Sequence, residues 1–296
     1  MKKFDISTDS NCDLYASEIE QLDLHVGHLS YIIDKNGEIT EHLDNFKTYE
    51  EYVDFYNQLR QGGVAKTSIL NVDTHVEMFR EMAQKGIKNA LHITQSYGLS
   101  PTLDNANKAI EIVKEEFPDI NYVAIESSTT TVGEGMLVRT ACKLRDQGKE
   151  MNEVIDILNK MKMQIQHLVI VDSLMFLKRG GRISGPKAVM GTLLNLKPVI
   201  EFTKEGKLEV ARKEMGMKKA VKSIIEEAKH YTKNTIDFQG VVVHCDNLPL
   251  AKEVQAQVKE AFGYEPEIRI MGPIIGAHVG PNAVAYAFIS NEERPF

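Results

Sequence analysis

The sequence predicts an α/β protein of two domains, and three observations support this fold class. Short apolar runs alternate with segments of helical periodicity in the first half of the chain, which is typical of βαβ units. The second half contains strand-like runs joined by a tight turn, which favours antiparallel neighbours. At 296 residues the chain is long enough for about two domains. We therefore expect an N-terminal domain at residues 1–166, with a mainly parallel sheet between helices, and a C-terminal α+β domain at residues 167–296, with a mixed or antiparallel sheet.

The elements of the first half follow from their patterns in order. Four apolar runs are expected to be buried strands: FDIS, VAKTS, ALHIT and NYVAIES. Three segments have the 3.6-residue periodicity of helices: TYEEYVDFYNQLRQ, VDTHVEMFREMAQKG and TLDNANKAIEIVKEEF. This order predicts a mainly parallel sheet, in which ligands bind at the carboxyl ends of the strands.

Polar side chains follow each of the four expected strands. They are Ser7 to Ser10, Thr67 with Ser68, Thr94 to Ser100, and Ser127 to Thr131. One interpretation is that each group supplies the N-cap of the next helix. The other is that the four groups meet at one edge of the sheet and line a binding site with hydroxyls.

The second half begins with a helix at MNEVIDILNKMKMQI, and we expect the domain boundary to follow near Gln166. No Pro/Gly/Ser linker marks it, so we expect tightly apposed domains. The later elements are expected to be the strand HLVIVDS, the hairpin KPVIEFTKEGKLEVARKE, the helix MKKAVKSIIEEAKHY, the strand GVVVHCD, the helix LPLAKEVQAQVKEAFG, and the strands EIRIMG and AVAYAFIS.

Two glycine-rich segments are predicted to be loops that approach a ligand closely. GPIIGAHVGP, at residues 272–281, carries His278, and KRGGRISGP, at residues 178–186, carries Arg182. Glycine lets backbone N–H groups approach a ligand, and an arginine with a histidine suits an anion such as a carboxylate or phosphate. The alternative is two tight turns with surface charges. The apolar stretch AVMGTLLNLKPVI that follows is either core packing or the wall of a lipid tunnel.

Composition excludes several classes of function. The net charge of -7, with no concentrated basic patch, argues against nucleic acid and anionic membranes as partners. No segment is apolar enough to be a signal peptide or to span a bilayer, so we expect a cytoplasmic protein. The three cysteines are scattered, which favours neither disulfides nor a metal site. His244 and Cys245 are adjacent on an expected strand and would point to opposite faces, so we expect no metal there.

The chain lacks the common signatures of enzymes. It contains no GxGxxG, GxxxxGK[ST], GxSxG or HExxH, so no cofactor is expected and the usual nucleotide, esterase and zinc-protease mechanisms lack their parts. A serine nucleophile with His278 as its base stays open, because catalytic triads need no proximity in sequence. The hydroxyls, Arg182 and His278 fit a binding protein better.

Six motifs in order give the chain a resemblance to a known family. They are STDSNCDL, KTSILNVD, ITQSYGLSPTLDNA, ESSTTTVGEG, VDSLMFLKRGGRIS and GPIIGAHVGP, and they cover nearly the whole chain. The chain resembles the DegV family of bacterial fatty-acid-binding proteins, which includes the binding subunits of fatty acid kinase. The resemblance implies a DegV-like fold and one long-chain fatty acid, of C14 to C20, buried between the domains. It also implies that the carboxylate is held by Thr67, Ser68 and Ser96, with Arg182 and His278 nearby.

The resemblance further implies a non-catalytic carrier that offers its lipid to a separate ATP-dependent kinase. The chain departs from the family pattern in three places: SYGLSPT replaces the usual SSGLSGT, no proline follows the TS pair, and EMGMKK lacks an arginine linked to kinase docking. Two alternatives to the carrier function remain. One is an acyl hydrolase or transferase that uses serine and histidine, and the other is a lipid storage or sensing protein without a kinase partner.

Overall fold

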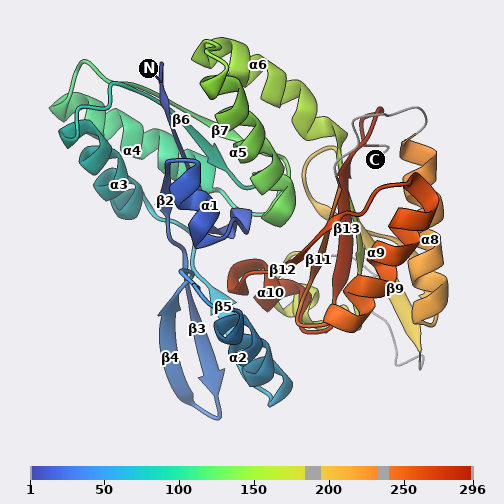
Figure 1. Cartoon of the computed structure of the whole chain (residues 1–296). Helices are drawn as coiled ribbons and strands as arrows, with labels where there is room; N and C mark the ends of the chain where they lie inside the picture. Colours follow the sequence, from blue (N-terminus) through green and yellow to red (C-terminus); the bar gives the residue numbers. More distant parts are fainter. Residues whose placement is uncertain (1, 184–194, 233–239, 295–296) are drawn as a thin grey trace.

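The computed structural model describes residues 2–183, 195–232 and 240–294, and two sheet-centred halves of the chain lie side by side in it (Figure 1). The N-terminal half lies to the left in this view and the C-terminal half to the right. The chain passes from one to the other at β8 (Ile165–Ile170). Among the described residues, no helix is both long enough and apolar enough to cross a membrane.

The first sheet has four parallel strands in the order β2-β1-β6-β7. The strands are β1 (Asp5–Asp9), β2 (Leu24–Gly27), β6 (Asn89–Thr94) and β7 (Asn121–Glu126). A 3₁₀ turn η1 (Ser10–Cys12) follows β1, and the helices are α1 (Ala16–Gln21), α3 (Val72–Gln84), α4 (Thr102–Glu116), α5 (Thr131–Asp146) and α6 (Met151–Met161). The predicted parallel sheet between helices is therefore confirmed.

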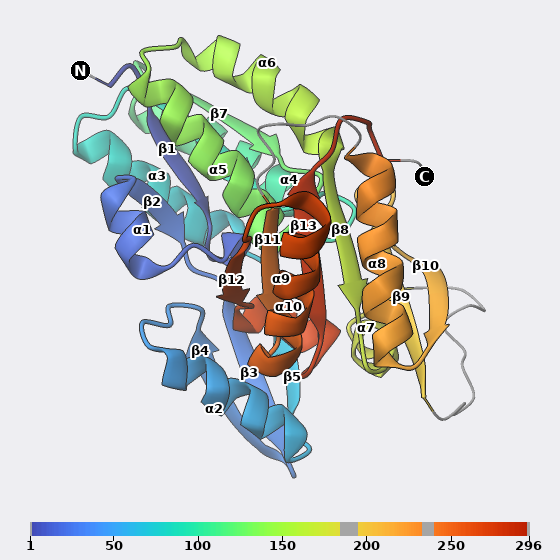
Figure 2. The same ribbon diagram turned by 45° about the vertical axis from the view of Figure 1, so that its right-hand side comes forward.

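A separate three-stranded antiparallel sheet interrupts this half of the chain. It has the order β4-β3-β5 and consists of β3 (Ser30–Lys35), β4 (Glu38–Leu43) and β5 (Val64–Thr67), with α2 (Tyr49–Arg60) between β4 and β5. The assignment of VAKTS to the parallel sheet was wrong, because β5 pairs antiparallel with β3 and places Thr67 opposite Tyr31. It is also only partly buried. This sheet and α2 extend below the rest of the molecule in Figure 2.

The C-terminal half is built on a mixed six-stranded sheet in the order β10-β9-β8-β13-β11-β12. Only β11 and β12 pair in parallel, and the predicted β9–β10 hairpin is present. After the 3₁₀ turn η2 (Lys162–Gln164) come α7 (Met175–Arg179), β9 (Leu196–Phe202), β10 (Leu208–Met215), α8 (Met217–Tyr231), β11 (Gly240–His244), α9 (Leu248–Phe262), β12 (Glu267–Ile270), α10 (Pro273–Val279) and β13 (Val284–Ile289).

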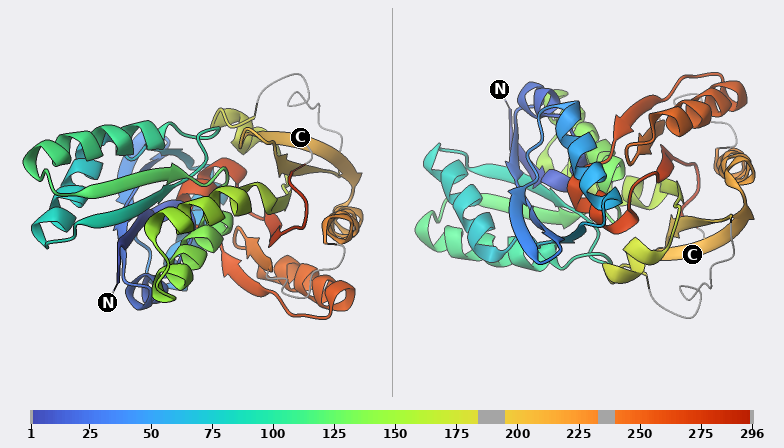
Figure 3. Two further views of the ribbon diagram at one scale, coloured as in Figure 1. Left: turned by 90° about the horizontal axis from the view of Figure 1, so that it is seen from above. Right: turned by 90° about the horizontal axis from the view of Figure 1, so that it is seen from below.

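Helices cover the outer face of each main sheet, and a shared core lies between the halves. α3 and α4 cover one face of the parallel sheet, and α8 and α9 cover the outer face of the mixed sheet (Figures 1 and 3). α5 packs against β1 and β6 on one side and against β8 and β13 on the other. One continuous apolar cluster runs through residues of both halves. The expected tight apposition follows from this shared core.

The predicted loop at residues 272–281 was wrong, since its centre is the helix α10. Pro273 occupies the first turn, where its missing N–H costs nothing, and Gly280 ends the helix with a φ of 81°. The proline and glycines that suggested a loop are thus the start and stop signals of a short helix. The apolar residues 188–194 and the end of the other glycine-rich segment, residues 184–186, lie outside the described residues.

Candidate functional site

A cavity opens between the two halves of the chain. It contains about 810 Å³ of space between atoms, part of which is open to solvent. The N-terminal half contributes Leu29, Thr67, Ser68, Ile69, Gln95, Leu99, Ser100, Thr130 and Thr131. The C-terminal half contributes mainly apolar side chains together with three basic ones: His167, Val169, Leu177, Arg182, Ile200, Phe202, Leu208, Met271, Ile274, Ile275, His278, Val279 and Ala285. The cavity is therefore largely apolar, with a minority of polar groups.

Thr67 and His278 meet at the polar part of this cavity. Thr67 is the last residue of β5, and His278 lies in the last turn of α10. The Thr67 hydroxyl and the His278 Nε2 atom are 2.9 Å apart, a hydrogen bond that joins the two halves. Ser68 follows Thr67, and its hydroxyl accepts a hydrogen bond from the Ser30 hydroxyl at 3.0 Å. Both residues that the TS motif singled out therefore line the cavity.

Arg182 supplies the cationic group of the cavity lining. It is half-buried, and its guanidinium donates to the carbonyl of Gly180. Among the described residues, no carboxylate forms an ion pair with it. Burial lowers the pKa of Arg182 from its usual 12.5, since a buried cation loses its hydration. A half-buried guanidinium without an anionic partner favours an anionic ligand.

His278 is mostly buried and closely packed. Burial, and to a lesser degree the charge of Arg182, lower its pKa to about 4, so the ring is neutral at pH 7. Its Nδ1 atom has no hydrogen-bond partner among the described residues. The ring packs on the backbone of Gly180, where any Cβ would collide with Nδ1. The glycine in KRGG thus allows the close approach that the sequence suggested, but it is the histidine that approaches.

Ser96 is placed differently from the other four predicted site residues. It is fully buried, and its hydroxyl donates to the carbonyl of Gly206 in the β9–β10 turn at 2.8 Å. It is not among the described residues that line the cavity. Gln95 and Ser100, which lie in the same loop, do line the cavity. Ser96 therefore fixes the loop that carries these neighbours against the C-terminal half.

The four groups of polar residues that follow the expected strands of the first half have different roles. Three of them contribute to the cavity, through Thr67 with Ser68, Ser100, and Thr130 with Thr131. The Ser7 to Ser10 group does not line it. The interpretation as helix caps was wrong for the helices that follow, because Asn71 caps α3, while the N-cap residues of α4 and α5, Pro101 and Thr130, make no side-chain cap bond.

Sequence reasoning missed a second histidine in the lining. His167 lies on β8, and its Nε2 atom is 2.7 Å from the Thr129 hydroxyl. Burial, with a further effect of Arg294, lowers its pKa to about 3. Neither Gly nor Pro surrounds His167 in HLVIVDS, so no local signal distinguished it from a core residue. The hydroxyl run at residues 127–131 was a signal for Thr130 and Thr131.

Comparisons with known proteins agree with this architecture. A family profile described as uncharacterised proteins of the DegV family matches residues 3–291. A DegV domain-containing protein of Clostridium perfringens is 32% identical over 296 residues, with all of both chains covered. One from Streptococcus pyogenes is 30% identical over 292 residues, covering 98% of this chain and 99% of that protein.

Solved structures extend the likeness to three dimensions. A DegV lipid-binding protein of Thermotoga maritima superposes with a TM-score of 0.85 at 26% identity, covering 99% of this chain and 100% of that one. A second Thermotoga maritima protein, described as having a fatty-acid-binding function, and a fatty-acid-binding DegV family protein of Thermus thermophilus each give a TM-score of 0.83 at 25% identity, covering 98% of this chain and all of theirs. The chain therefore belongs to the DegV family.

Proposed function

We propose that this chain binds one long-chain fatty acid in the cavity between its halves and presents the carboxylate to a partner kinase in the cytoplasm for acyl phosphate formation. The observation that carries the proposal is the shape and chemistry of the cavity. A mainly apolar lining includes a half-buried arginine, whose charge acts on His278, and the hydrogen-bonded pair of Thr67 and His278. The fatty-acid-binding relatives of the same fold support the choice of ligand.

The polar end of the cavity suits a carboxylate. In the tautomer in which His278 Nε2–H donates to the Thr67 oxygen, the Thr67 proton is free to donate to the ligand. Ser68 adds a second hydroxyl and Arg182 the opposite charge, and we propose these four residues as the carboxylate site. A buried carboxylate without such donors would be costly. We propose that Ser96 contributes by holding the loop of Gln95 and Ser100 in place.

The rest of the lining suits an alkyl chain. Leucine, isoleucine, valine, phenylalanine and methionine side chains form most of the wall. Burial of an acyl chain contributes roughly 0.8 kcal/mol per CH₂. We propose a chain of C14 to C20, the range that the resemblance to the family implies, and longer chains in this range gain more from burial.

Native mass spectrometry of the purified protein tests the lipid. We expect a retained fatty acid in about one-to-one amount. Thr67→Val and Arg182→Gln each remove a donor to a charged acceptor, a loss of roughly 1.5–3 kcal/mol, and should lower affinity about ten- to hundredfold. Thr40→Val is a matched control, since Thr40 is an exposed strand residue outside the lining. A protein that stays lipid-free after incubation with C14 to C20 acids would contradict the proposal.

The kinase step has its own test. The sequence contains no GxxxxGK[ST] loop to cradle phosphates, so we expect the pure chain with ATP, Mg²⁺ and fatty acid to give no turnover. Addition of a fatty acid kinase subunit should give acyl phosphate, measured as ADP release and as trapped hydroxamate. If lipid binds but no kinase of the source organism uses it, the chain is a storage or sensing protein instead.

An acyl hydrolase or transferase is the second candidate, since Thr67 and His278 form a hydroxyl–imidazole pair. A catalytic triad needs a third group that orients the histidine. Here His278 Nδ1 faces Gly180 and has no partner among the described residues. Release of free acid from an acyl ester by the pure chain, abolished by His278→Ala, would favour the hydrolase.

A further inference from the structure

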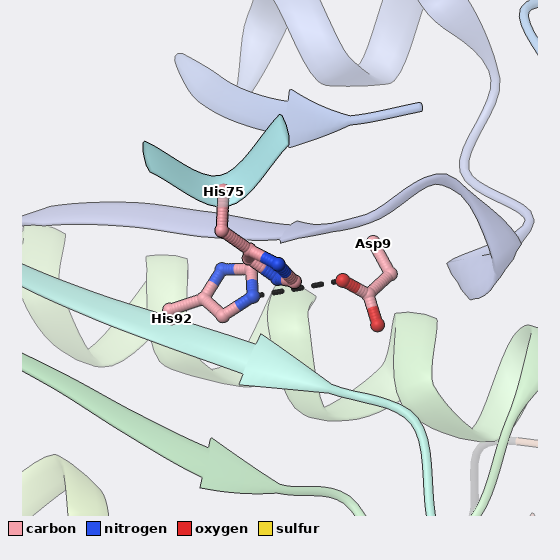
Figure 4. Close-up of side chains that lie close together, drawn as sticks. All are labelled: Asp9, His75 and His92. Carbon is pink, nitrogen blue, oxygen red and sulfur yellow. Dashed lines mark ion pairs between the residues drawn. The ribbon is translucent and has the colours of Figure 1, made fainter. Parts of the chain in front are cut away.

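Three buried side chains converge between the parallel sheet and α3, away from the cavity lining (Figure 4). Asp9 ends β1, His92 lies on β6, and His75 lies in the first turn of α3. Their exposures are 0%, 1% and 0%. One candidate ligand atom from each lies within 4.8 Å of the other two. Among the described residues, no other group of three or more His, Cys, Asp or Glu side chains comes this close.

The fold explains why these residues meet. Side chains alternate along a strand, so Ser7 and Asp9 point to the same face of the sheet, and His92 is the partner of Ser7 on β6. The Asn71 side chain accepts the Thr74 N–H at 2.9 Å and so fixes the start of α3. His75 then lies on the side of the helix that faces the sheet, and its ring centroid is 5.2 Å from that of His92.

The cluster contains polar atoms that the protein itself leaves unpartnered. Asp9 Oδ1, His75 Nε2 and His92 Nε2 are buried and have no hydrogen-bond partner among the described residues. Asp9 Oδ1 and His92 Nε2 are 3.5 Å apart, the pair joined by a dashed line in Figure 4. The other Asp9 oxygen accepts only a long bond, 3.4 Å, from the Gln95 N–H. Burial of a carboxylate with so few donors is costly unless a cation lies beside it or a proton neutralises it.

The Nδ1 atoms of His75 and His92 each have a hydrogen-bond partner within the protein. His75 Nδ1 lies 2.9 Å from the Asn71 carbonyl, which can only accept, so Nδ1 carries the proton and Nε2 has a free lone pair. His92 Nδ1 lies 2.9 Å from the Ser7 hydroxyl. Metal-binding histidines are held in this way, with one ring nitrogen fixed by a backbone carbonyl or polar group and the other turned to the ion.

We propose that Asp9, His75 and His92 form a binding site for one divalent transition-metal ion, with Zn²⁺ as its representative. Imidazole and carboxylate ligands suit zinc and its neighbours in the first row. With bonds of about 2.0–2.1 Å, a tetrahedral ion sets its ligand atoms about 3.4 Å apart. The Asp9 and His92 atoms are 3.5 Å apart, and all three ligand atoms lie within 4.8 Å of one another. Three protein ligands leave a fourth position for water.

A proton shared by His92 and Asp9 is the competing explanation. It would satisfy Asp9 Oδ1 and His92 Nε2, but His75 Nε2 would still be a buried lone pair without a donor. A metal ion engages all three atoms at once. The site also has a structural consequence, because Asp9 is bonded to the backbone of Gln95, which lines the cavity. The ion would fix the end of β1 and the first turn of α3 behind that loop.

The test uses the full chain without an affinity tag. Protein from cells grown with added Zn²⁺ should contain about one zinc per chain by inductively coupled plasma mass spectrometry. Protein from cobalt medium should show the visible d–d absorption of four-coordinate Co²⁺. Asp9→Asn, His75→Gln and His92→Gln should each lower the metal content at least tenfold, with circular dichroism to confirm folding.

His25→Gln is the matched control. His25 lies on β2 of the same sheet and also pairs with an aspartate, Asp5, at 3.5 Å, but no third ligand completes that pair among the described residues. This variant should keep its metal. Should a cluster variant fail to fold, the wild-type chain decides: dipicolinate should lower its melting temperature, and Zn²⁺ should restore it. A wild type with no stoichiometric zinc and no cobalt absorption, or cluster variants that keep their metal, would overturn the proposal.

Discussion

At the scale of single residues, burial sets the charge states around the cavity. His278 and His167 are both neutral at pH 7, since burial lowers their pKa values to about 4 and about 3. Each instead makes a hydrogen bond to a threonine hydroxyl. Positive charge in the described lining is therefore left to Arg182. Arg182 would therefore attract a charged ligand, whereas the two neutral histidines act only through hydrogen bonds.

Asp13 gives a prediction about pH at this scale. Its carboxylate accepts the Gly272 N–H at 3.0 Å and the Thr131 hydroxyl, so it joins η1 to the start of α10. Burial, with the nearby Asp44 charge, raises its pKa from 3.8 to about 8. Between these two values the folded state holds a proton that the unfolded state releases. Stability is therefore greatest at acidic pH and falls as pH rises from about 4 to about 8, by at most roughly 1.4 kcal/mol per pH unit for this group.

Asp13→Asn should remove this contribution, because asparagine imitates the protonated acid. We expect urea denaturation from pH 4.5 to 8 to show a smaller loss of stability with rising pH in the variant than in wild type. Burial raises the pKa of Asp44 to about 6. The variant should therefore still lose some stability with rising pH in the lower part of this range, but less steeply than wild type. Parallel curves for wild type and variant across the whole range would show that Asp13 is ionised in the folded protein.

At the scale of elements, α10 connects the site to the rest of the fold. His278 lies near its end, and its other face packs against α2 through Gly276 and Tyr56. Tyr56 is fully buried, and its hydroxyl donates to the carbonyl of Met271 at 2.8 Å, just before the helix. The position of the His278 ring therefore depends on a contact that Gly276 makes two residues away, on the other face of the helix.

Gly276→Ala should disturb this contact. The new Cβ would collide with the Tyr56 ring and hydroxyl, in a fully packed environment. Overpacking of this kind costs about 1–3 kcal/mol, which urea denaturation would measure. Fatty-acid retention should fall as α10 shifts and Thr67 and His278 separate. Adding Tyr56→Phe to the variant should recover part of the loss by removing the hydroxyl oxygen; no recovery would locate the strain elsewhere.

The elements also show how far the sequence reaches. Strong periodicity predicted α2, α3, α4, α6, α8 and α9, since their apolar faces repeat along the chain. The separate β4-β3-β5 sheet was not predicted, because β4 is exposed along most of its length and has no alternation of apolar residues. α10 was not predicted because Gly276 serves packing against Tyr56 and Gly280 ends the helix, so neither glycine marks a flexible loop. In each case the deciding contact is distant in sequence.

The candidate site shows the same limit. Arg182 and His278 were predicted because glycines surround them. Thr67 and Ser68 were predicted because they follow an expected strand and match a motif of the family. His167 had no such signal, and only its place on β8 brings it to the cavity. The Asp9, His75 and His92 cluster was invisible for the same reason. Its members come from a strand, a helix and a second strand, whereas the expectation of no metal site was based on the scattered cysteines and on the adjacent His244 and Cys245.

At the scale of the whole molecule, the two halves are tied together outside the cavity as well. The β9–β10 turn packs on the loop after β6, where Ser96 bonds to the Gly206 carbonyl. The chain end adds a second link through Arg294, which is 1% exposed despite being two residues from the C-terminus of the sequence. Its guanidinium lies over the ring of Phe202, a residue of the cavity wall.

Arg294 therefore carries the last prediction. Its guanidinium donates to four carbonyls, those of Ser128 in the N-terminal half at 2.6 Å, Lys162 at 2.9 Å, Ile165 at 2.9 Å and Thr203 at 3.2 Å. Burial lowers its pKa to about 10, so it stays charged at pH 7. Arg294→Ala would leave these carbonyls with fewer donors and should cost on the order of 3–5 kcal/mol in urea denaturation.

Two further variants separate the hydrogen bonds from the charge. Arg294→Lys keeps the charge but lacks the planar fork that reaches several carbonyls, so its stability should lie between those of wild type and Arg294→Ala. Glu293→Ala is the matched control, because Glu293 is the exposed neighbour, and it should stay within about 0.5 kcal/mol of wild type. Fatty-acid retention should fall with stability, since Phe202 loses the group stacked on it. If Arg294→Ala were as stable as wild type, Arg294 would not hold the halves together, and their alignment would depend on the shared core and on contacts such as the Ser96–Gly206 bond.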